Sequence, residues 1–205
     1  MATYEQDQRE AEFLGAEGAG TISREVVTIA SGEDIASGAV LGQITLGAIT
    51  ATPDAGNTGD GLIGTVTGDG TQEAGDYTLT IVTADTDAGE FQLVNPDGDM
   101  VGFGTVGVAF AGGGLSFTLA DGAADFVVGD SIVITVAAGS GKYVELDPTA
   151  TDGSQAAAAI SYSTVDATAA DTSATVIARL AEVYEDKLVW ATGVTAGQKT
   201  TALAE

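Results

Sequence analysis

Hydrophobic and polar residues alternate with a period of two in four short segments from the middle of the chain. These segments are residues 77–82, 90–94, 115–119 and 131–136. Because a strand points successive side chains to opposite faces, this alternation predicts strands with one buried face. Gly and Asp punctuate the same region about every eight to twelve residues, the turn spacing expected of a small all-β sandwich.

Shorter apolar segments before and after this region predict further strands. Residues 25–29 and 35–44 read as two strands separated by the turn at 31–34. Residues 174–184 have the Ala and Leu content of a helix, but their β-branched residues favour a strand. Residues 187–190 read as another short strand. A terminal helix is expected over 195–204, with Thr195 as its N-cap.

The change in residue composition and pattern along the chain predicts a discontinuous host domain with a second domain inserted in it. Residues 53–137 have the Gly/Asp-punctuated pattern and the size of a small independent β domain. Residues 22–52 and 138–205 then form the host domain. Insertion at a hairpin tip is tolerated because closing a long loop costs little. The expected fold class is mainly β: a small β-rich domain with a short terminal helix, plus an inserted domain resembling a β-sandwich.

Residues 1–21 are polar and rich in Gly, Ala and Glu, and apolar side chains are sparse there. Tyr4, Phe13 and Leu14 lie within this stretch, and Ile22 follows it. One interpretation is a disordered tail. The other is a flexible arm that becomes ordered on a partner, anchored by Phe13 and Leu14.

The charge of the chain excludes several classes of partner. Thirty acidic residues face six basic ones among 205 residues, which gives a formal net charge of −24. Nucleic-acid binding normally depends on Lys and Arg neutralising phosphates, so we expect no nucleic-acid partner. An anionic membrane surface is disfavoured for the same reason. A hydrophobic content of 44% nevertheless predicts a folded chain.

The chain contains no Cys and no His. Disulfides, thiolate metal sites and the commonest general base are therefore excluded. The first ten residues lack the basic and apolar regions of a secretory signal, and no apolar run approaches the ~20 residues that span a bilayer. We expect synthesis in the host cytoplasm.

The candidate chemical motifs are weak, and we assign no catalytic, cofactor-binding or metal-binding residue. Residues 85–90 resemble the opening of a calcium loop, but Gly89 and Pro96 stand where that loop needs oxygen ligands. Residues 95–99 read first as a hairpin turn and second as an ion site. Trp190 reads as a packing residue, with sugar stacking as the alternative. Pairs of carboxylates are expected by chance in so acidic a chain.

Several stretches of the host domain resemble a known family. They are residues 39–42, 141–160, 165–172 and 182–190, together with the terminal helix. In these residues the chain is similar to the phage-lambda-type head decoration proteins, the capsid-stabilising protein D family. The resemblance covers somewhat over half of the chain. The block 53–137 departs from the family's minimal pattern, and the resemblance implies nothing about its role.

The resemblance implies a structural protein on the outer capsid surface of the virion. Members of this family bind as homotrimers at local three-fold sites of the expanded shell, where an N-terminal arm pairs with the major capsid protein. In this sequence the arm would use Tyr4, Phe13, Leu14 and Ile22. The expected trimer contacts are Lys142, Tyr143, Ala156, Ala157, Ala158, Arg179 and Trp190. Strand-edge pairing suits a polar arm because main-chain groups supply the hydrogen bonds.

Two alternatives from other classes remain open. The chain would be a surface β module if residues 53–137 made weak contacts with a glycan or a host surface. It would be an enzyme if two carboxylates with divergent pKa values flanked a deep pocket. Binding of glycans would support the first alternative, and a pocket with bound substrate would support the second.

Overall fold

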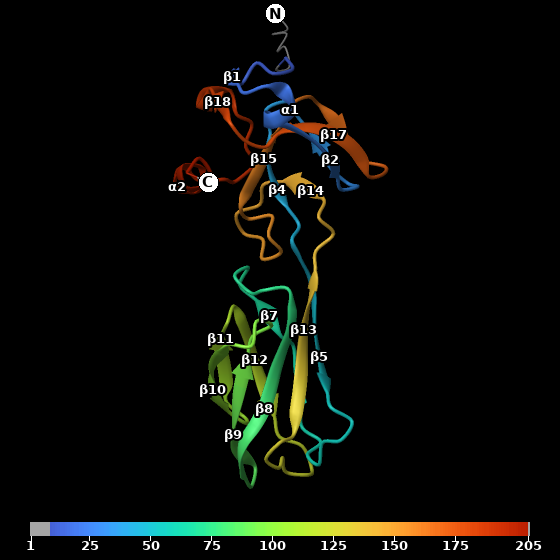
Figure 1. Ribbon diagram of the computed structural model, residues 1–205, viewed down its shortest axis with the longest axis vertical. Coiled ribbons are helices and arrows are strands. Elements are labelled where there is room, and N and C mark those ends of the chain that lie inside the picture. Colours follow the sequence, from blue (N-terminus) through green and yellow to red (C-terminus); the bar gives the residue numbers. More distant parts are fainter. Residues whose placement is uncertain (1–8, 205) are drawn as a thin grey trace, which may run out of the picture. The chain divides into compact units, whose positions relative to one another are not determined.

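The computed structural model describes residues 9–204 and is mainly β (Figure 1). The chain divides into two compact units. Unit 1 contains the chain up to Ile44 and from Gly141 onward, and unit 2 contains Thr45–Ser140. Among the described residues, no helix has the length and apolarity required to cross a membrane.

Unit 1 is built on a closed barrel of five short strands in the order β14-β2-β17-β15-β4. Their bounds are Arg24–Ile29 for β2, Val40–Gln43 for β4, Tyr143–Glu145 for β14, Ala157–Ser161 for β15 and Thr172–Ile177 for β17. All neighbouring pairs are antiparallel except β14 and β2, which meet in parallel. Closure leaves no open edge in this sheet.

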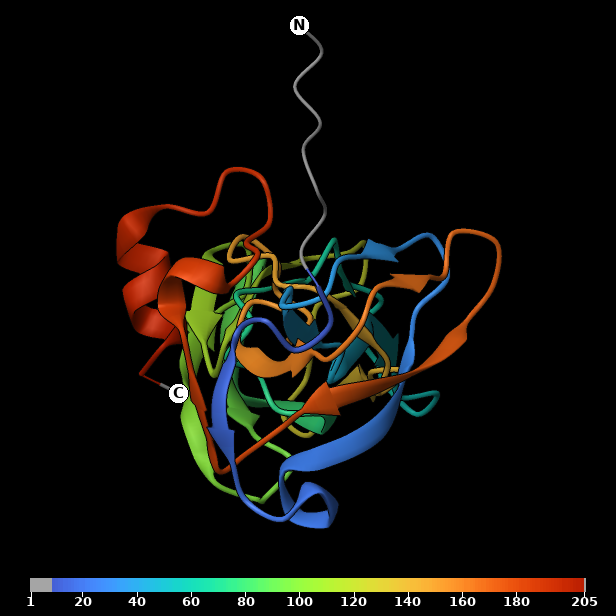
Figure 2. The same cartoon turned by 90° about the horizontal axis from the view of Figure 1, so that it is seen from above.

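Smaller elements surround the barrel of unit 1. Strand β1 (Leu14–Glu17) pairs with β18 (Ala181–Val183), and β3 (Asp34–Ile35) pairs with β16 (Val165–Asp166). Figure 2 shows β1 in dark blue alongside β18 in red-orange. The helical elements are α1 (Gly20–Ser23), the 3₁₀ turn η1 (Glu185–Lys187) and α2 (Ala196–Ala202). Helix α2 begins at a capping box in which Thr195 and Gln198 exchange hydrogen bonds, as its sequence predicts.

The strands of the barrel contribute to two separate hydrophobic cores. Leu41 and Val176 belong to one cluster, whereas their neighbours Val40 and Ile177 belong to another that includes Phe13. Because successive side chains point to opposite faces of a strand, the same strands contribute side chains to both cores. The barrel is therefore packed on both of its faces.

Unit 2 consists of two sheets. The larger has the order β10-β9-β8-β13-β5, with bounds Leu46–Pro53 for β5, Gly75–Asp85 for β8, Ala88–Val94 for β9, Met100–Thr105 for β10 and Ser131–Ala138 for β13. The smaller contains β6 (Leu62–Ile63), β7 (Thr67–Gly68), β11 (Ala109–Gly112) and β12 (Leu115–Ala120). Every paired neighbour in both sheets is antiparallel.

The two sheets of unit 2 share one hydrophobic core. Alternate residues of β8, β9, β12 and β13 are buried, which confirms the period-two prediction for all four segments. Phe91 from the larger sheet stacks on Phe117 from the smaller one, with ring centroids 5.9 Å apart, and meets Phe110 edge-on. Such aromatic pairs add to the stability that area burial provides.

Three details differ from the sequence-based expectations. Residues 46–53, which we assigned mostly to the host domain, form β5 of unit 2, because they pair with β13 over almost the whole strand. Residues 187–190 are not a strand, since η1 ends at Lys187 and Val189 makes only an isolated bridge with Ala39. The predicted strand 174–184 is interrupted at Leu180, whose φ is +50°.

Candidate interaction surface

A groove of about 290 Å³ in unit 1 gathers four residues expected at a trimer contact, namely Ala157, Ala158, Arg179 and Trp190. We call it the unit 1 groove. Its lining is apolar apart from Arg179, the one charged residue among the described residues that form it. In a chain with 30 acidic residues, this groove is a concave surface without acidic lining residues.

Small and buried residues give the unit 1 groove its depth. Val40 and Ile177 are almost fully buried at 3% and 4% exposure, and they form part of its lining. Strand β15 contributes alanines, and Ala157 faces Gly42 of β4 in the sheet. A Cβ on Gly42 would overlap the carbonyl group of Ser154, so the strand must carry glycine there. Larger residues in these strands would fill the groove.

Leu180 forms an exposed rim of the unit 1 groove and has a strained backbone. Its φ of +50° lies in the left-handed region, which costs a residue with a side chain roughly 1–2 kcal/mol. Two hydrogen bonds hold its carbonyl oxygen in place, one donated by Ser23 Oγ at 3.1 Å and one by Gly18 N at 3.0 Å. The side chain is 69% exposed, so burial does not explain the strain.

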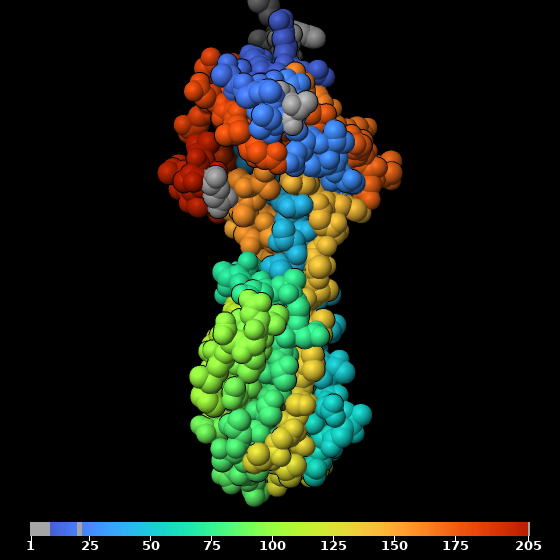
Figure 3. Space-filling model, in the orientation of Figure 1, coloured from blue at the N-terminus to red at the C-terminus, as the bar shows by residue number. Residues whose placement is uncertain are grey.

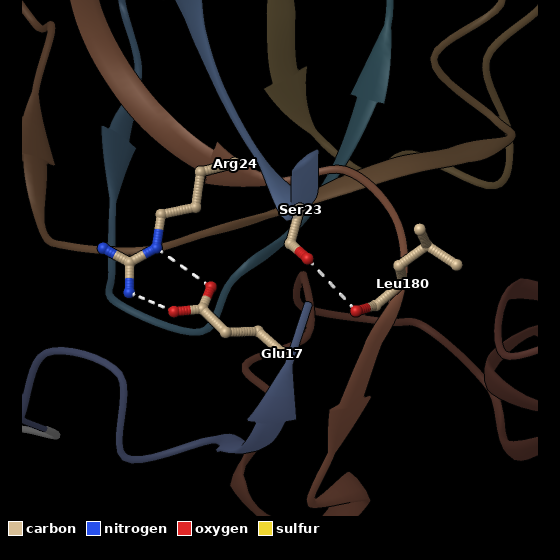
Figure 4. Close-up of polar contacts among 4 residues, drawn as sticks. All are labelled: Glu17, Ser23, Arg24 and Leu180. Atoms are coloured by element: carbon tan, nitrogen blue, oxygen red, sulfur yellow. Dashed lines mark hydrogen bonds and ion pairs between the residues drawn. The ribbon is translucent and has the colours of Figure 1, made fainter. Parts of the chain in front are cut away.

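An ion pair lies close to this turn (Figure 4). Arg24 donates from Nε and Nη2 to the two carboxylate oxygens of Glu17, at 3.0 and 2.5 Å. The hydrogen bond from Arg24 lowers the pKa of Glu17 below its ordinary value. The guanidinium of Arg24 also lies 4.1 Å from the centre of the Tyr162 ring. Strand β1 is therefore linked to β2, next to the Ser23–Leu180 contact.

The two polar or aromatic residues of the unit 1 groove have partners within unit 1. Arg179 pairs with Glu25 and donates from Nη1 to the carbonyl oxygen of Ile22 at 3.0 Å. Trp190 is half-buried, and the Lys199 ammonium lies 5.4 Å from the centre of its ring. A surface that contains a half-buried Trp and a paired Arg has the composition favoured at interface centres.

The other expected trimer-contact residues do not line the unit 1 groove. Lys142 forms a salt bridge with Asp171 at 2.5 Å. Tyr143 belongs to β14, where it pairs with Gln43 and Ile29 and packs against the cluster that contains Leu41. Ala156 is exposed and precedes β15. These three residues are of the same types as the groove residues: a cation, an aromatic residue and an alanine. Residue type alone therefore could not distinguish the two sets in the sequence.

The N-terminal segment differs from the arm expected at residues 1–21. Phe13 is fully buried at 0% exposure, and β1, which begins at Leu14, pairs with β18. The reason is that Phe13 fills a core formed by distant residues such as Leu146 and Leu188, which local polarity could not reveal. Ile22 is exposed at 47%. Tyr4 lies outside the described residues, as do the other residues of 1–8.

An acidic hollow of about 630 Å³ lies elsewhere in unit 1, lined in part by Glu33, Glu145, Asp147 and Asp152. Burial and then the charge of Glu33 raise the pKa of Glu145. The side-chain and backbone hydrogen bonds from Thr149 lower the pKa of Asp147. Glu33 Oε2 accepts a hydrogen bond from Glu145 N at 3.1 Å, so this carboxylate is engaged with the backbone.

A second acidic cluster lies in unit 2. One carboxylate oxygen from each of Asp87, Asp121 and Asp125 lies within 4.8 Å of the others. Asp125 Oδ1 accepts a hydrogen bond from Asp87 N at 3.2 Å, which ties the β8–β9 turn to the 121–125 loop. Residues 95–99 form a turn closed by two hydrogen bonds, from Asn95 N to Asp99 O and from Asp99 N to Asn95 Oδ1, as the hairpin interpretation predicts.

Comparison with known proteins identifies the class as structural capsid decoration proteins of bacteriophages. The family model described as Bacteriophage lambda head decoration protein D matches residues 3–111 and 115–205. Because this match covers nearly the whole chain, the chain belongs to the lambda head decoration protein D family. The family implies a role in decorating the phage capsid. No curated protein sequence matches the chain.

Some solved structures share partial similarity with the chain. FlgL from Xanthomonas campestris aligns at 21% identity and a TM-score of 0.37, over 53% of this chain and 34% of that one. The hook junction protein FlgK from Burkholderia pseudomallei aligns at 25% identity and a TM-score of 0.37, over 64% of this chain and 23% of that one. The chain thus spans about a third or less of these structures.

Proposed function

We propose that this chain binds the outside of the expanded phage capsid as trimers at local three-fold sites and stabilises the shell against disruption. The observation that carries the proposal is the match to the decoration protein family over nearly the whole chain. The partners are two further copies of the chain and the major capsid protein. The virion's outer surface is then the place of action.

The unit 1 groove is the best candidate for the contact between copies. Each chain carries a net charge of −24, so copies repel one another wherever acidic surfaces meet. The groove has no acidic lining residue, and its one cation, Arg179, is already paired. The strained, exposed Leu180 at its rim is suited to enter the surface of a neighbouring copy.

Contact with the capsid is assigned to the N-terminal end of unit 1. Phe13 is buried and Leu14 pairs with Val183 within unit 1, so we assign the capsid contact to the part of the expected arm that precedes them, which includes Tyr4. Ile22 is exposed, and its carbonyl oxygen is bonded by Arg179 of the unit 1 groove. Three short arms on one trimer would bind avidly, because each bound arm raises the effective concentration of the others.

Two variants test the two contacts separately. Ala158→Arg places a long cation in the unit 1 groove, and Ala156→Arg is the matched control at an exposed alanine outside it. We expect the first to sediment as a monomer and the second as a trimer. Deleting residues 1–8 should leave the trimer intact and abolish co-sedimentation with empty expanded capsids. A deletion variant that still decorates shells, or an Ala158→Arg trimer, would contradict the respective contact.

For unit 2 we propose at most a weak contact with a glycan or host surface. A hollow of about 460 Å³ is lined by Phe110 and Phe117 together with the hydroxyl-bearing Thr65, Ser116 and Thr118. Aromatic rings beside hydroxyl groups suit a sugar, which has apolar faces and polar edges. Glycan-array binding by the full chain that is lost in Phe110→Ala would support this role. An array with no binding would remove it.

A further inference from the structure

Strand β5 (Leu46–Pro53) forms an open edge of the larger sheet in unit 2. It pairs with β13 on one side, and no strand among the described residues pairs with its other side. Figure 1 shows β5 at the margin of unit 2, and Figure 3 shows its atoms at the surface in blue to cyan. An unpaired edge presents a row of backbone donors and acceptors to any strand that can approach it.

The composition of β5 leaves this edge unprotected. Its eight residues contain no charged side chain, although 30 of the 205 residues are acidic. Natural edge strands are normally shielded by charges, bulges or prolines. Strand β5 has a proline only at its last residue and a register irregularity only near its start, between Leu46 and Ile49. The opposite edge strand, β10, has an irregular register between Met100 and Gly102 and contacts β11 of the other sheet. Strand β5 pairs regularly with β13 from Ile49 to Pro53, and this neutral stretch has no strand on its other side among the described residues.

We propose that β5 is a self-association edge, through which the unit 2 sheets of two copies join into one continuous antiparallel sheet. The two-fold axis passes through Thr50, so that Thr50 of each copy faces Thr50 of the other. Ala48 then faces Thr52 of the partner copy. This register keeps the half-buried Ile49 and Ala51 on the core side of both sheets and the exposed Ala48, Thr50 and Thr52 on the outer side.

A second copy is the occupant that the charge distribution favours. Elsewhere the acidic surfaces of two copies repel, whereas a two-fold axis at β5 brings a neutral edge against the same neutral edge. Opposed threonines are also a favourable cross-strand pair. The inference is independent of the capsid-binding proposal and concerns the free protein as well. Any assembly that holds several copies close together strengthens the pairing through effective concentration.

Single cysteines provide the test, because the chain has none of its own. Opposed residues of antiparallel strands have Cα atoms about 4.5–5.5 Å apart, within the range that a disulfide spans. Under mild oxidation we expect Thr50→Cys in the full-length protein to form covalent dimers. Thr78→Cys is the matched control, since Thr78 is an exposed threonine on the central strand β8 of the same sheet. We expect it to cross-link at least tenfold more slowly.

The register and the interaction are tested by two further measurements. Ala48→Cys and Thr52→Cys should cross-link poorly alone and readily when the two variants are mixed. Thr50→Glu brings two carboxylates together and should abolish concentration-dependent dimerisation in sedimentation equilibrium, whereas Thr78→Glu should not. Equal cross-linking rates for Thr50→Cys and Thr78→Cys would overturn the proposal. A Thr50→Glu variant that self-associates like the wild-type protein would also overturn it. That result is expected as well if β5 pairs with a different protein and not with a second copy.

Discussion

Replacing Asp130 with Ala should destabilise unit 2 by about 3 kcal/mol. Asp130 is 5% exposed and directly precedes β13. Its Oδ1 accepts a hydrogen bond from Thr58 N at 3.0 Å, and its Oδ2 accepts from Gly59 N at 2.9 Å and Val127 N at 3.1 Å. One carboxylate thus holds two loops that no regular strand pairing connects.

The magnitude follows from the three backbone donors that lose their acceptor. A buried donor left unsatisfied costs about 1–3 kcal/mol. Thr58 and Val127 are exposed, so water can replace part of the lost bonding, and the lower value of about 1 kcal/mol for each donor applies. Asp130→Asn is the matched control, because it retains one acceptor oxygen and the side-chain shape. We expect it to lose less, about 1–2 kcal/mol.

The effect of Asp130 depends on pH with a definite sign. Burial raises the pKa of Asp130, but the hydrogen bonds from Gly59, Thr58 and Val127 outweigh it and hold the pKa below the ordinary value of 3.8. A lowered pKa in the folded state stabilises the fold above the unfolded-state value, and this stability is lost as pH falls through the folded-state pKa. The difference between wild-type and Ala variant should therefore shrink in strong acid.

Hydrogen exchange read by mass spectrometry measures this loss peptide by peptide. Peptides from residues 54–60 and 126–138 should exchange faster in Asp130→Ala at neutral pH. The single Trp, Trp190, lies in unit 1 and reports on that unit during urea unfolding. An Ala variant within 0.5 kcal/mol of the wild-type protein, or as stable as the Asn variant, would refute the reasoning.

Three further substitutions have expected outcomes. Glu145→Gln should raise the urea midpoint at pH 7 and not at pH 4. Burial and the charge of Glu33 raise the pKa of Glu145, so ionising this carboxyl in the folded state costs stability as pH rises. Equal shifts of the midpoint at both pH values would contradict this. Gly42→Ala should destabilise unit 1 by about 1–3 kcal/mol in thermal unfolding, since the added Cβ overlaps Ser154; a neutral result would mean that the 152–154 loop can move away. Leu180→Gly should stabilise the isolated chain by up to about 1 kcal/mol and weaken the trimer in sedimentation equilibrium; lower stability of the chain would show that the positive φ is not strained.

Strands in which apolar and polar residues alternate strictly could be predicted from the sequence, because successive side chains point alternately into the core and toward the solvent. Strands β8, β9, β12 and β13 each show this pattern. Strand β10 was not among the predicted strands, and its residues show no strict alternation of buried and exposed positions. The glycine at 104 is needed for packing: a Cβ on Gly104 would overlap the ring of Phe91, its cross-strand partner on β9. Long-range packing of this kind leaves no local signal.

The candidate interaction surface was only partly predictable. Small residues at 156–159 indicated close approach, but they did not show that Ala157 and Ala158 face the groove while Ala156 does not. The burial of Phe13 depends on Leu146 and Leu188, which lie more than a hundred residues away in sequence. Polar sequence around Phe13 therefore suggested a free arm. The strained φ of Leu180 has no sequence signature, because leucine normally avoids that conformation.

Strands β5 and β13 carry the chain into and out of unit 2 and are direct neighbours, with Leu46 opposite Ala138. On the unit 1 side, Ile44 exchanges hydrogen bonds with Gly141 and Lys142. Once unit 2 has folded, the polypeptide behaves there as a tight hairpin in place of a loop on the order of a hundred residues. The entropic cost of closing the loop between β4 and β14 is then lower by about 3 kcal/mol. The order of folding events should therefore run from the insert to the barrel, and foreign domains with adjacent termini should be exchangeable at the same junction.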